Sequence, residues 1–580
     1  MKKYILLLLL FVSSVAFGQT VILSGKIVDA NKQPISFGDA FLLSKKDSTL
    51  IKYAPVKAEG FVFDAVQKGD YILKISCLGF DEKLEPVFLL ADKNLTIALN
   101  GTIATLKEVT VKSSKKTFTN INGNTKVNIE NSPFASIPNP IELLSKLPAI
   151  QVAPSGESVS IIGKGEPLIY IENQRVSIAD LNALSVNDIK TIEIINNPSS
   201  KYEANGRAVI LITRKSNKKE GLKVDLAETI SVRKYVTNRA VADVNLKKKK
   251  LELKTNFQYN QIKNWEGNAY DFRINNQNIQ SSYDVTAVTT RPQFIIGTGA
   301  YYEIDSVNNI SINTTIRPQS ETFPINTNSY LKNSIVDDHV LTNSLNKSSK
   351  LFTTTNLNYN RNFKKLEAQL FVGAQYSTLN QTLESNIFDN YNNTQFNLSQ
   401  ERKQNNKVDV FTARADVEKT FNNKMKLETG VNFSAPTSTS LVNIEKYNPV
   451  SNTSSNYQYN EKDYAAYTQL SGSIKKVDYS VGVRVETTDV KGKFRDSASF
   501  LVDKNNTQLF PKINIDVPID SLLTLNLNYA KTIDRPNFSS ISEVTTYINP
   551  YFEWSNNTHI SPSVTNEISA TLQHKEKSFV

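Results

Sequence analysis

Cysteine and histidine are nearly absent from this chain of 580 residues, which contains one cysteine and three histidines. The single cysteine, Cys77, excludes an internal disulfide framework. His339, His559 and His574 are too scattered for a zinc site with ligands at motif spacing. No nucleophile–base pair or metal-ligand cluster stands out either. The sequence therefore predicts no catalytic residues, no cofactor-binding residues and no metal site, and a protein that is not an enzyme.

Long apolar runs are missing beyond the N-terminus. Residues 1–18 are expected to be a secretory signal peptide, with Lys2-Lys3 as its positive start, Tyr4–Val12 as its apolar core and Ala16-Phe17-Gly18 as the cleavage site. No cysteine follows the predicted cut, which argues against a lipoprotein anchor. No later stretch approaches the roughly 18 apolar residues that mark a membrane helix. We therefore expect the mature protein to leave the cytoplasm without an inner-membrane helix.

The composition by itself resembles that of a soluble protein, with 39% hydrophobic residues and a mean hydropathy of −0.33. A transmembrane β-barrel is not excluded, because its apolar residues alternate with polar ones along each strand. The net charge is +11, but no basic helix or aromatic–basic motif accompanies it, so nucleic-acid binding is not predicted. The basic run Lys247–Lys250 is expected in a turn or at the membrane rim. The length allows several domains.

Residues 19–100 are expected to form a small β-sandwich. The strand-like stretches, separated by turn residues, are Val21–Asp29, Phe37–Leu43, Phe61–Val66 and Tyr71–Leu78. The pattern resembles the carboxypeptidase regulatory-like domain, on the pieces Gly25-x-x-x-Asp29, Pro34, Gly60-Phe61-x-Phe63, Gly69-x-Tyr71 and Gly79-Phe80. That resemblance implies a transthyretin-like sandwich and no catalytic zinc motif. Cys77 is expected to be a small core residue on a strand.

Residues 121–218 are expected to form a small α+β unit. Short β-runs at Val159–Ile162, Leu168–Ile171, Thr191–Ile195 and Ala208–Thr213 surround one amphipathic helix. This helix should start at Ser177, with Asp180 completing a capping box and Ile178, Leu181 and Leu184 on the buried face. A second short helix is expected at Pro140–Leu147, with proline in its first turn. Asn205-Gly206 predicts a tight hairpin turn, because both positions would need positive φ.

The same unit resembles the plug domain of the TonB-dependent receptor family, in the Bacteroidetes-type outer-membrane branch. The resemblance lies in Leu147-Pro148, in Gly163–Ile171 with Pro167 and Tyr170, in Ile192–Ile195, in Asn197-Pro198-Ser199-Ser200-Lys201-Tyr202-Glu203 and in Gly206. The family usually continues Gly-x-Ala-Gly-Ile-Ile-Asn-Ile, whereas Val209 here replaces the second small residue. If the resemblance holds, the preceding part of the chain is periplasmic and the following part is a barrel.

Residues 101–120 are expected to be a polar linker that carries a TonB box. The segment Leu106–Val111, with Glu108, Val109, Thr110 and Val111 at its centre, is similar to the extended stretch that TonB captures before many plugs. Such capture pairs the peptide backbone with the sheet edge of the partner, so its sequence requirements are loose. The alternative is that this stretch is simply the first strand of the plug.

From residue 219 to residue 580, apolar and polar residues alternate with period two. Examples are Leu251–Tyr259, Leu366–Tyr376, Phe411–Glu418, Leu427–Phe433, Tyr479–Val485 and Leu523–Tyr529, with turns expected at Asn308-Asn309, Asn362, Asn422-Asn423 and Pro518–Ser521. This pattern is typical of a transmembrane antiparallel barrel. A large soluble β-sandwich would also alternate, but charged residues recur on the polar face of strand after strand, which suits a water-filled lumen. Tyr259, Tyr301-Tyr302, Tyr376, Phe433 and Tyr529 could form the interfacial aromatic girdle.

Residues 529–570 carry a second resemblance to these Bacteroidetes barrels. It lies in Tyr529-Ala530, Ile533, Arg535-Pro536, Phe538, Asn549-Pro550-Tyr551, Pro562 and Glu567, with Ser555-Asn556-Asn557 where Gly-Asn-Pro is usual. Barrels of this group are expected to have roughly 22 strands. About 14–16 can be marked in the sequence, so the barrel is expected to be incomplete, through C-terminal truncation.

The resemblance implies a TonB-dependent receptor that binds an extracellular ligand and imports it through a plugged barrel in the outer membrane. Its implied partners are TonB with its inner-membrane energising complex, outer-membrane lipid and lipopolysaccharide, and a possible surface lipoprotein. The ligand stays open among iron chelates, vitamin B12-like compounds, glycans and peptides. The alternative function is surface binding, adhesion or signalling without transport. Tyr202 and Arg207 are expected to contact the barrel wall rather than the ligand.

Overall fold

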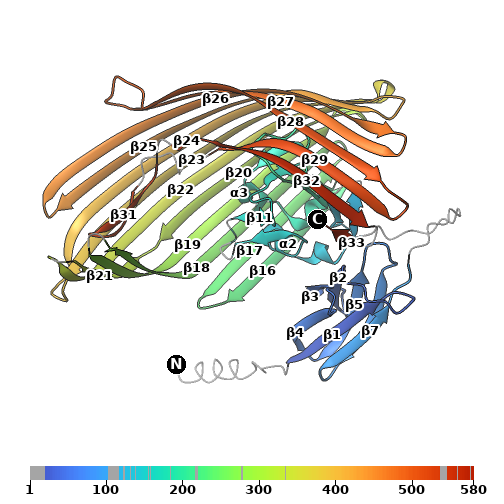
Figure 1. Ribbon diagram of the computed structural model, residues 1–580, viewed down its shortest axis with the longest axis horizontal. Helices are drawn as coiled ribbons and strands as arrows, with labels where there is room; N and C mark the ends of the chain where they lie inside the picture. Colours follow the sequence, from blue (N-terminus) through green and yellow to red (C-terminus); the bar gives the residue numbers. More distant parts are fainter. Residues whose placement is uncertain are drawn as a thin grey trace.

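The computed structural model is built almost entirely of β-strands (Figure 1). It describes residues 20–101, 117–121, 124–130, 132–137, 139–153, 156, 158–182, 184–215, 220–275, 278–333, 335–535, 545–557, 560–574 and 577–579. A small sandwich, an α+β unit and a large curved sheet follow one another along the chain, as predicted for the fold class. The expected signal peptide and most of the expected linker lie outside the described residues.

Residues 20–98 form two sheets that pack face to face. One sheet has the order β4 (Phe61–Gln67), β1 (Thr20–Val28), β7 (Lys93–Ala98), and the other has the order β3 (Leu50–Pro55), β2 (Asp39–Ser44), β5 (Gly69–Ser76), β6 (Lys83–Leu89). Leu23, Leu42 and Leu73 are completely buried between them. The sandwich was predicted, although β3, β6 and β7 were not, because their apolar residues are interrupted by lysine and glutamate.

Cys77 lies in the core of this sandwich, as predicted. Burial raises the pKa of its thiol to about 12. The thiolate, which is the reactive form, is therefore scarce at neutral pH.

Asp39 on β2 gives the sandwich a pH-dependent stability. Its carboxylate accepts a hydrogen bond from the Tyr53 hydroxyl at 2.7 Å, and burial raises its pKa to about 6 despite that bond. The folded state thus holds this proton more tightly than the unfolded state, so the stabilisation is complete below about pH 4 and is lost as the pH rises through 6. We expect the opening free energy of β2 amides, measured by hydrogen exchange in the whole protein, to fall between pH 5 and pH 7. Asp39→Asn should remove that dependence; a slope that persists in the variant would contradict the assignment.

The α+β unit, residues 117–215, lies within the curve of the large sheet, and we call it the plug (Figure 1). Its six-stranded sheet has the order β13 (Gln174–Val176), β12 (Leu168–Ile171), β15 (Val209–Arg214), β14 (Ile189–Ile195), β9 (Asn124–Asn128), β8 (Phe118–Ile121). A separate hairpin pairs β10 (Ile150–Val152) with β11 (Val159–Ile161). The short helices are η1 (Pro133–Ser136), α2 (Pro140–Ser145), α3 (Ile178–Asn182) and η2 (Val186–Asp188). Among the described residues, no helix is long and apolar enough to cross a membrane.

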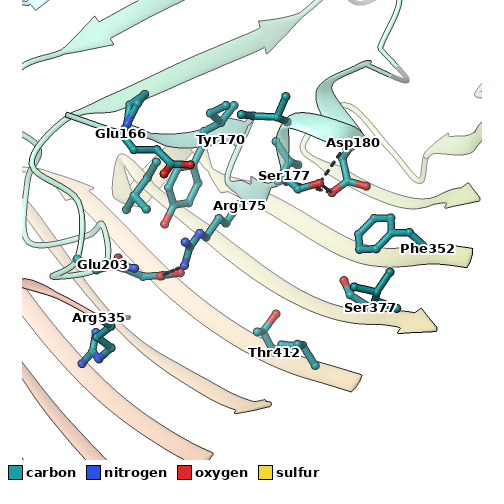
Figure 2. Close-up of a pocket in the computed structure, with 18 of the residues that line it drawn as sticks. Glu166, Tyr170, Arg175, Ser177, Asp180, Glu203, Phe352, Ser377, Thr412 and Arg535 are labelled. Atoms are coloured by element: carbon teal, nitrogen blue, oxygen red, sulfur yellow. Dashed lines mark hydrogen bonds and ion pairs between the residues drawn. The ribbon is translucent and has the colours of Figure 1, made fainter. Parts of the chain in front are cut away.

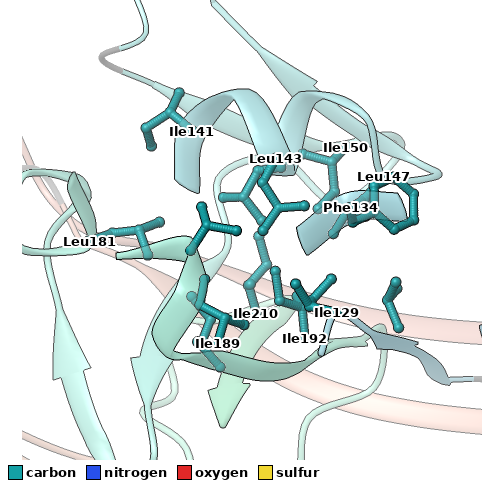
Figure 3. Packing of buried hydrophobic residues seen from close by; sticks show 14 of the residues in the cluster. Ile129, Phe134, Ile141, Leu143, Leu147, Ile150, Leu181, Ile189, Ile192 and Ile210 are labelled. Carbon is teal, nitrogen blue, oxygen red and sulfur yellow. The ribbon is translucent and has the colours of Figure 1, made fainter. Parts of the chain in front are cut away.

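The helices of the plug begin where the sequence predicts. The Ser177 hydroxyl accepts from the Asp180 N–H at 3.1 Å, and the Asp180 carboxylate accepts from the Ser177 N–H at 3.0 Å, which is the predicted capping box. The Asn139 side chain caps α2 by accepting from the Glu142 N–H at 2.7 Å. Leucine and isoleucine side chains of α2, α3 and the sheet then close one continuous core (Figure 3).

The predicted tight hairpin at Asn205-Gly206 is wrong. Strands β14 and β15 are antiparallel neighbours, but residues 196–208 join them, and neither Asn205 nor Gly206 has a positive φ. Gly206 is needed for space instead, because a Cβ there would come within 2.5 Å of Leu168 Cδ1. The dipeptide pattern reports local turn chemistry and carries no information on packing against a distant strand.

The sandwich packs directly on the plug. Phe41, on the outer face of the β3–β2–β5–β6 sheet, is completely buried and meets Phe134 of η1 edge to face, with ring centroids 5.3 Å apart. Phe134 also meets Phe118 of β8 in the same geometry. The Leu50 N–H donates to the Ser136 hydroxyl at 3.2 Å. The apolar core of the plug thereby extends into the sandwich, a contact between domains that the sequence does not predict.

The large sheet contains sixteen strands among the described residues, each antiparallel to its neighbours. In order of the chain they are β16 (Gly221–Val232), β17 (Val236–Lys248), β18 (Leu251–Ile274), β19 (Ile279–Glu303), β20 (Asn308–Thr322), β21 (Ile325–Lys332), β22 (Asp337–Phe363), β23 (Ala368–Tyr391), β24 (Asn397–Thr420), β25 (Lys426–Tyr447), β26 (Val450–Ile474), β27 (Val477–Phe494), β28 (Val502–Pro518), β29 (Leu523–Asp534), β32 (Ser563–His574) and β33 (Lys577–Phe579). Strands β20 and β21 both pair with β19 and β22, so they act as one strand interrupted at Phe323-Pro324.

Alternation along these strands separates an apolar outer face from a polar inner face. On β24, Phe411 and Val417 are exposed on the outside, whereas Asp416 is buried on the inside. Three details differ from the prediction. The turn before β20 is made by Asp305, whose carboxylate accepts from the N–H groups of Val307 and Asn308, so Asn308-Asn309 already belong to a strand. Asn362 likewise lies within β22. Tyr301 faces inward, under the guanidinium of Arg214 at 5.4 Å, and is not part of an outer girdle.

Candidate functional site

The segment between β14 and β15, residues 196–208, lies against the inner wall of the barrel. Several of its backbone groups are bound by side chains from the wall. The Ser200 N–H donates to Gln469 Oε1 at 2.7 Å, and Lys512 Nζ donates to the Pro198 carbonyl at 2.9 Å. The Ala204 N–H donates to Glu486 Oε1 at 3.2 Å. We call this set of contacts the plug latch.

Two further contacts strengthen the latch. Arg414 Nη2 donates to the Lys201 carbonyl at 3.4 Å, while its Nη1 donates to the Asn173 carbonyl at 3.3 Å. The Ala204 carbonyl accepts from the Ile533 N–H at 3.1 Å, the residue with which β29 nears its end. Backbone groups of the plug that would otherwise be buried without partners are thus satisfied by the barrel.

Glu486 is the central side chain of the latch. Its carboxylate, 5% exposed, accepts from Ala204 of the plug, from Arg484 on the same strand and from Arg535 beyond β29, the last at 2.6 Å. Arg484 is 2% exposed. A buried carboxylate between two guanidinium groups is favourable only while all partners remain in place. Glu486 therefore joins the plug to the segment that follows β29.

The six plug-motif residues chosen from the sequence separate into two places. Asn197, Pro198, Tyr202 and Gly206 lie in the latch segment, whereas Pro167 and Tyr170 line a cavity beside it. Tyr202 packs edge to face on Tyr170, with centroids 5.0 Å apart, so it contacts the plug itself and not primarily the wall. Burial raises the pKa of Tyr170 to about 12 and keeps its hydroxyl neutral. The aromatic pair holds the latch segment against β12.

Arg207 contacts the barrel wall, as predicted. Its Nη2 lies 2.8 Å from Glu567 Oε2 on β32, and Lys164 of the plug pairs with the other oxygen of the same carboxylate. At the far side of the plug, Arg214 Nη1 donates to Asn313 Oδ1 at 3.3 Å, and Lys254 Nζ lies 3.3 Å from Asp188 Oδ1. Polar contacts of this kind surround the plug.

A cavity of about 1590 Å³ lies between the plug and the barrel wall. From the plug, β12 and β13 contribute Tyr170 and Arg175, and Arg175 pairs with Glu203 (Figure 2). The wall contributes charged and polar side chains from many strands: Arg239, Asn260, Arg291, Gln293, Arg317, Phe352, Ser377, Thr412, Glu461, Asp463, Glu486 and Arg535. A cavity this large and this polar suits a hydrated, polar ligand.

Sequence reasoning missed the wall residues of the latch and the cavity. Gln469, Glu486 and Lys512 were seen only as members of the polar face of their strands. The alternation shows that they point inward, but which of them meets the plug depends on register and curvature. Within the part of the chain that the structure describes, no three His, Cys, Asp or Glu side chains come together to hold a metal ion. The predicted TonB-contact residues Glu108, Val109, Thr110 and Val111 lie outside the described residues.

Comparison with known proteins supports the same architecture. Residues 361–580 match a family model described as the outer membrane protein beta-barrel family. No curated protein matches the chain. A solved structure titled "Copper transporter OprC" is similar at 11% identity and a TM-score of 0.51, over 78% of this chain and 68% of that one.

Two receptors of Acinetobacter baumannii are similar at lower scores. They are BauA, the ferric preacinetobactin receptor (11% identity, TM-score 0.48, 80% of this chain and 69% of that one), and the siderophore receptor PiuA (11% identity, TM-score 0.47, 79% and 70%). At such identities the likeness concerns the fold alone, and the argument here uses only the structure above 0.5. Together with the matched barrel family, the shared fold shows that this chain is an outer-membrane β-barrel protein whose lumen holds a plug.

Proposed function

We propose that the protein is a TonB-dependent receptor that binds an extracellular ligand and imports it through its plugged barrel. The observation that carries the proposal is the plug latch beside a large polar cavity. The plug is held in the lumen by many separate polar contacts, and each contributes about 0.5–1.5 kcal/mol net. A plug held in this way can be released stepwise in a hydrated lumen, whereas a continuous apolar interface would resist release.

The arrangement connects ligand binding to the plug in two ways. The cavity is lined by plug strands β12 and β13, so a ligand there touches the plug directly. It is also lined by Arg535, which binds the same carboxylate of Glu486 that accepts from Ala204. A ligand that draws Arg535 away weakens the latch on the plug.

The finer parts of the proposal follow the sequence resemblance. TonB, energised from the inner membrane, would pull on the segment Glu108–Val111 from the periplasm, where the carboxypeptidase regulatory-like sandwich lies. The barrel would be of the Bacteroidetes type, would contact lipopolysaccharide and could work with a surface lipoprotein. The protein would perform selective binding and gated passage and no covalent chemistry. The titles of the similar structures name copper transport and siderophore reception, which supports import as the activity.

The proposal is tested by capture of the mature protein, in detergent, on the immobilised C-terminal domain of TonB. We expect the wild type to bind and Val109→Pro to lose binding, because proline removes the backbone donor that strand pairing requires. Ser114→Pro, in the same linker, is the matched control and should bind like the wild type.

Each outcome has a distinct meaning. Binding that survives Val109→Pro would keep energised import but move the contact to another segment. No binding by the wild type would overturn the proposal in favour of a plugged barrel for surface binding, adhesion or signalling.

A further inference from the structure

A β-hairpin that is not part of the barrel sheet lies at the end of the barrel opposite the plug. It consists of β30 (Thr545–Asn549) and β31 (Phe552–Ser555), from the connection between β29 and β32. Figure 1 shows β31 beside β21 and β25, remote from the helices of the plug. We call residues 545–555 the strap.

The strap is held on the barrel wall by buried side-chain hydrogen bonds. The Tyr547 hydroxyl donates to Asp389 Oδ2 at 2.8 Å, while Thr342 of the wall donates to Oδ1 of the same carboxylate at 2.6 Å. Asn549 Nδ2 donates to the Ser329 hydroxyl at 2.9 Å. Asn549 is 2% exposed and Ser329 is 1% exposed, so this contact is closed to solvent.

Charged and aromatic contacts complete the docking. Arg402 Nη2 lies 3.1 Å from Glu553 Oε2, and its guanidinium lies over the ring of Tyr547 at 5.2 Å. The Tyr551 hydroxyl donates to Asp338. Phe552 packs on Tyr283 of β19, with centroids 5.5 Å apart. The strap thus begins its connection at β29 and docks on β19 and β21–β24, several strands away around the barrel.

The strap and the plug block the lumen at two different levels. On β23, Asp389 binds the strap and Gln375 pairs with Gln174 of the plug. The fourteen residues that separate these positions span about 45 Å along an extended strand. The large cavity lies between the two levels, and both ends of the strap's own connection line it, through Arg535 on one side and Ile560 and Pro562 on the other.

The chemistry of the docking distinguishes a movable element from a fixed one. The hairpin's paired strands are hydrogen-bonded to each other and contribute no ladder to the barrel sheet. Its printed bonds to the wall are all made by side chains, which can be exchanged for water one at a time. A segment added to the sheet as a strand would be far harder to detach.

We propose that the strap is a second gate, which closes the cavity on the side away from the plug and opens independently of the plug to admit the ligand. The strap then controls access from outside, and the plug controls release toward the periplasm. This inference goes beyond the import proposed above and does not depend on TonB, because it concerns an equilibrium of the barrel alone.

The gate is tested by cysteine labelling of the whole protein in outer membranes, with a bulky maleimide that does not cross lipid. The native Cys77 is buried and gives a low background. Ser329→Cys places a thiol under the strap, and we expect it to react completely but at least tenfold more slowly than Asp337→Cys, an exposed position at the start of β22. A second reporter, Thr412→Cys, lies in the cavity.

Adding Tyr547→Phe removes one bond to the wall and should accelerate labelling of both Ser329→Cys and Thr412→Cys by about tenfold, which corresponds to 1.4 kcal/mol. Tyr529→Phe is the matched control, because its hydroxyl bonds Asn566 at an exposed site and its loss should change neither rate. Labelling of Asp337→Cys should also stay constant, which shows that the barrel remains folded.

Three results would overturn the gate. Ser329→Cys that never reacts would show a permanently fixed strap, and Ser329→Cys that reacts as fast as Asp337→Cys would show that the strap does not dock. Tyr547→Phe that accelerates labelling at Ser329→Cys but not at Thr412→Cys would show a mobile strap that does not control the cavity. None of these readouts uses TonB or a ligand, so failure of the gate is distinguishable from failure of the import proposal.

Discussion

Glu486→Gln is expected to free the plug from the barrel wall. The substitution removes the negative charge that lies between Arg484 and Arg535 and weakens the acceptor for the Ala204 N–H. Breaking a buried ion pair by removing one partner costs about 3–5 kcal/mol, because the remaining charge is left uncompensated. The population of undocked plug should therefore rise by more than about a hundredfold. Conductance across planar bilayers that contain the purified protein measures this release.

The matched control is Glu384→Gln, which breaks an ion pair on the solvent-exposed part of a barrel strand. Lys403 Nζ lies 2.9 Å from Glu384 Oε1, and both side chains are more than half exposed. Exposed ion pairs contribute about 0–1 kcal/mol, so the conductance of this variant should equal that of the wild type. Equal conductance of the Glu486→Gln variant and the wild type would show that the latch does not retain the plug through this carboxylate.

Phe134→Ala is expected to uncouple the sandwich from the plug and to destabilise both. Phe134 is completely buried, and its ring meets Phe41 of the sandwich and Phe118 of the plug edge to face. Removing a buried phenylalanine side chain costs about 3–5 kcal/mol through lost burial and the cavity left behind. Hydrogen exchange of amides in β2 and β8 of the whole protein should accelerate together by that amount.

Phe88→Ala provides the comparison for that experiment. Phe88 lies on the outer face of the same sandwich sheet but is 55% exposed, and its truncation should change exchange in β2 and β8 little. If Phe134→Ala accelerated exchange in β8 but left β2 unchanged, the sandwich would be stable without the plug and the interface would carry no coupling.

The elements of this protein follow from local patterns in the sequence. Ser177 and Asp180 are three residues apart and meet in a capping box, and Pro140 begins a short helix, because both effects act within one turn. The alternation at Phe411–Glu418 places Phe411 outside and Asp416 inside, because side chains on a strand point to opposite faces. The barrel as a class of fold was predictable for this reason.

Local patterns fail where residues distant in the chain decide the outcome. Asn205-Gly206 has the composition of a tight turn, but the close approach of Leu168 and the contacts of Ala204 with Glu486 and Ile533 determine its conformation. Tyr202 was expected on the wall and packs on Tyr170 instead. Asn308 was expected in a turn that Asp305 makes three residues earlier.

The sequence alone determined the order of sandwich, plug and barrel and the side of each strand that faces the lumen, because hydrophobic periodicity depends only on neighbouring residues. Tertiary structure decided which lumen-facing side chains meet the plug, where the cavity opens, and that the hairpin at Tyr547 crosses to Asp389. Those contacts join residues more than a hundred positions apart. Their existence depends on strand register and on the curvature of the sheet, which no local pattern encodes.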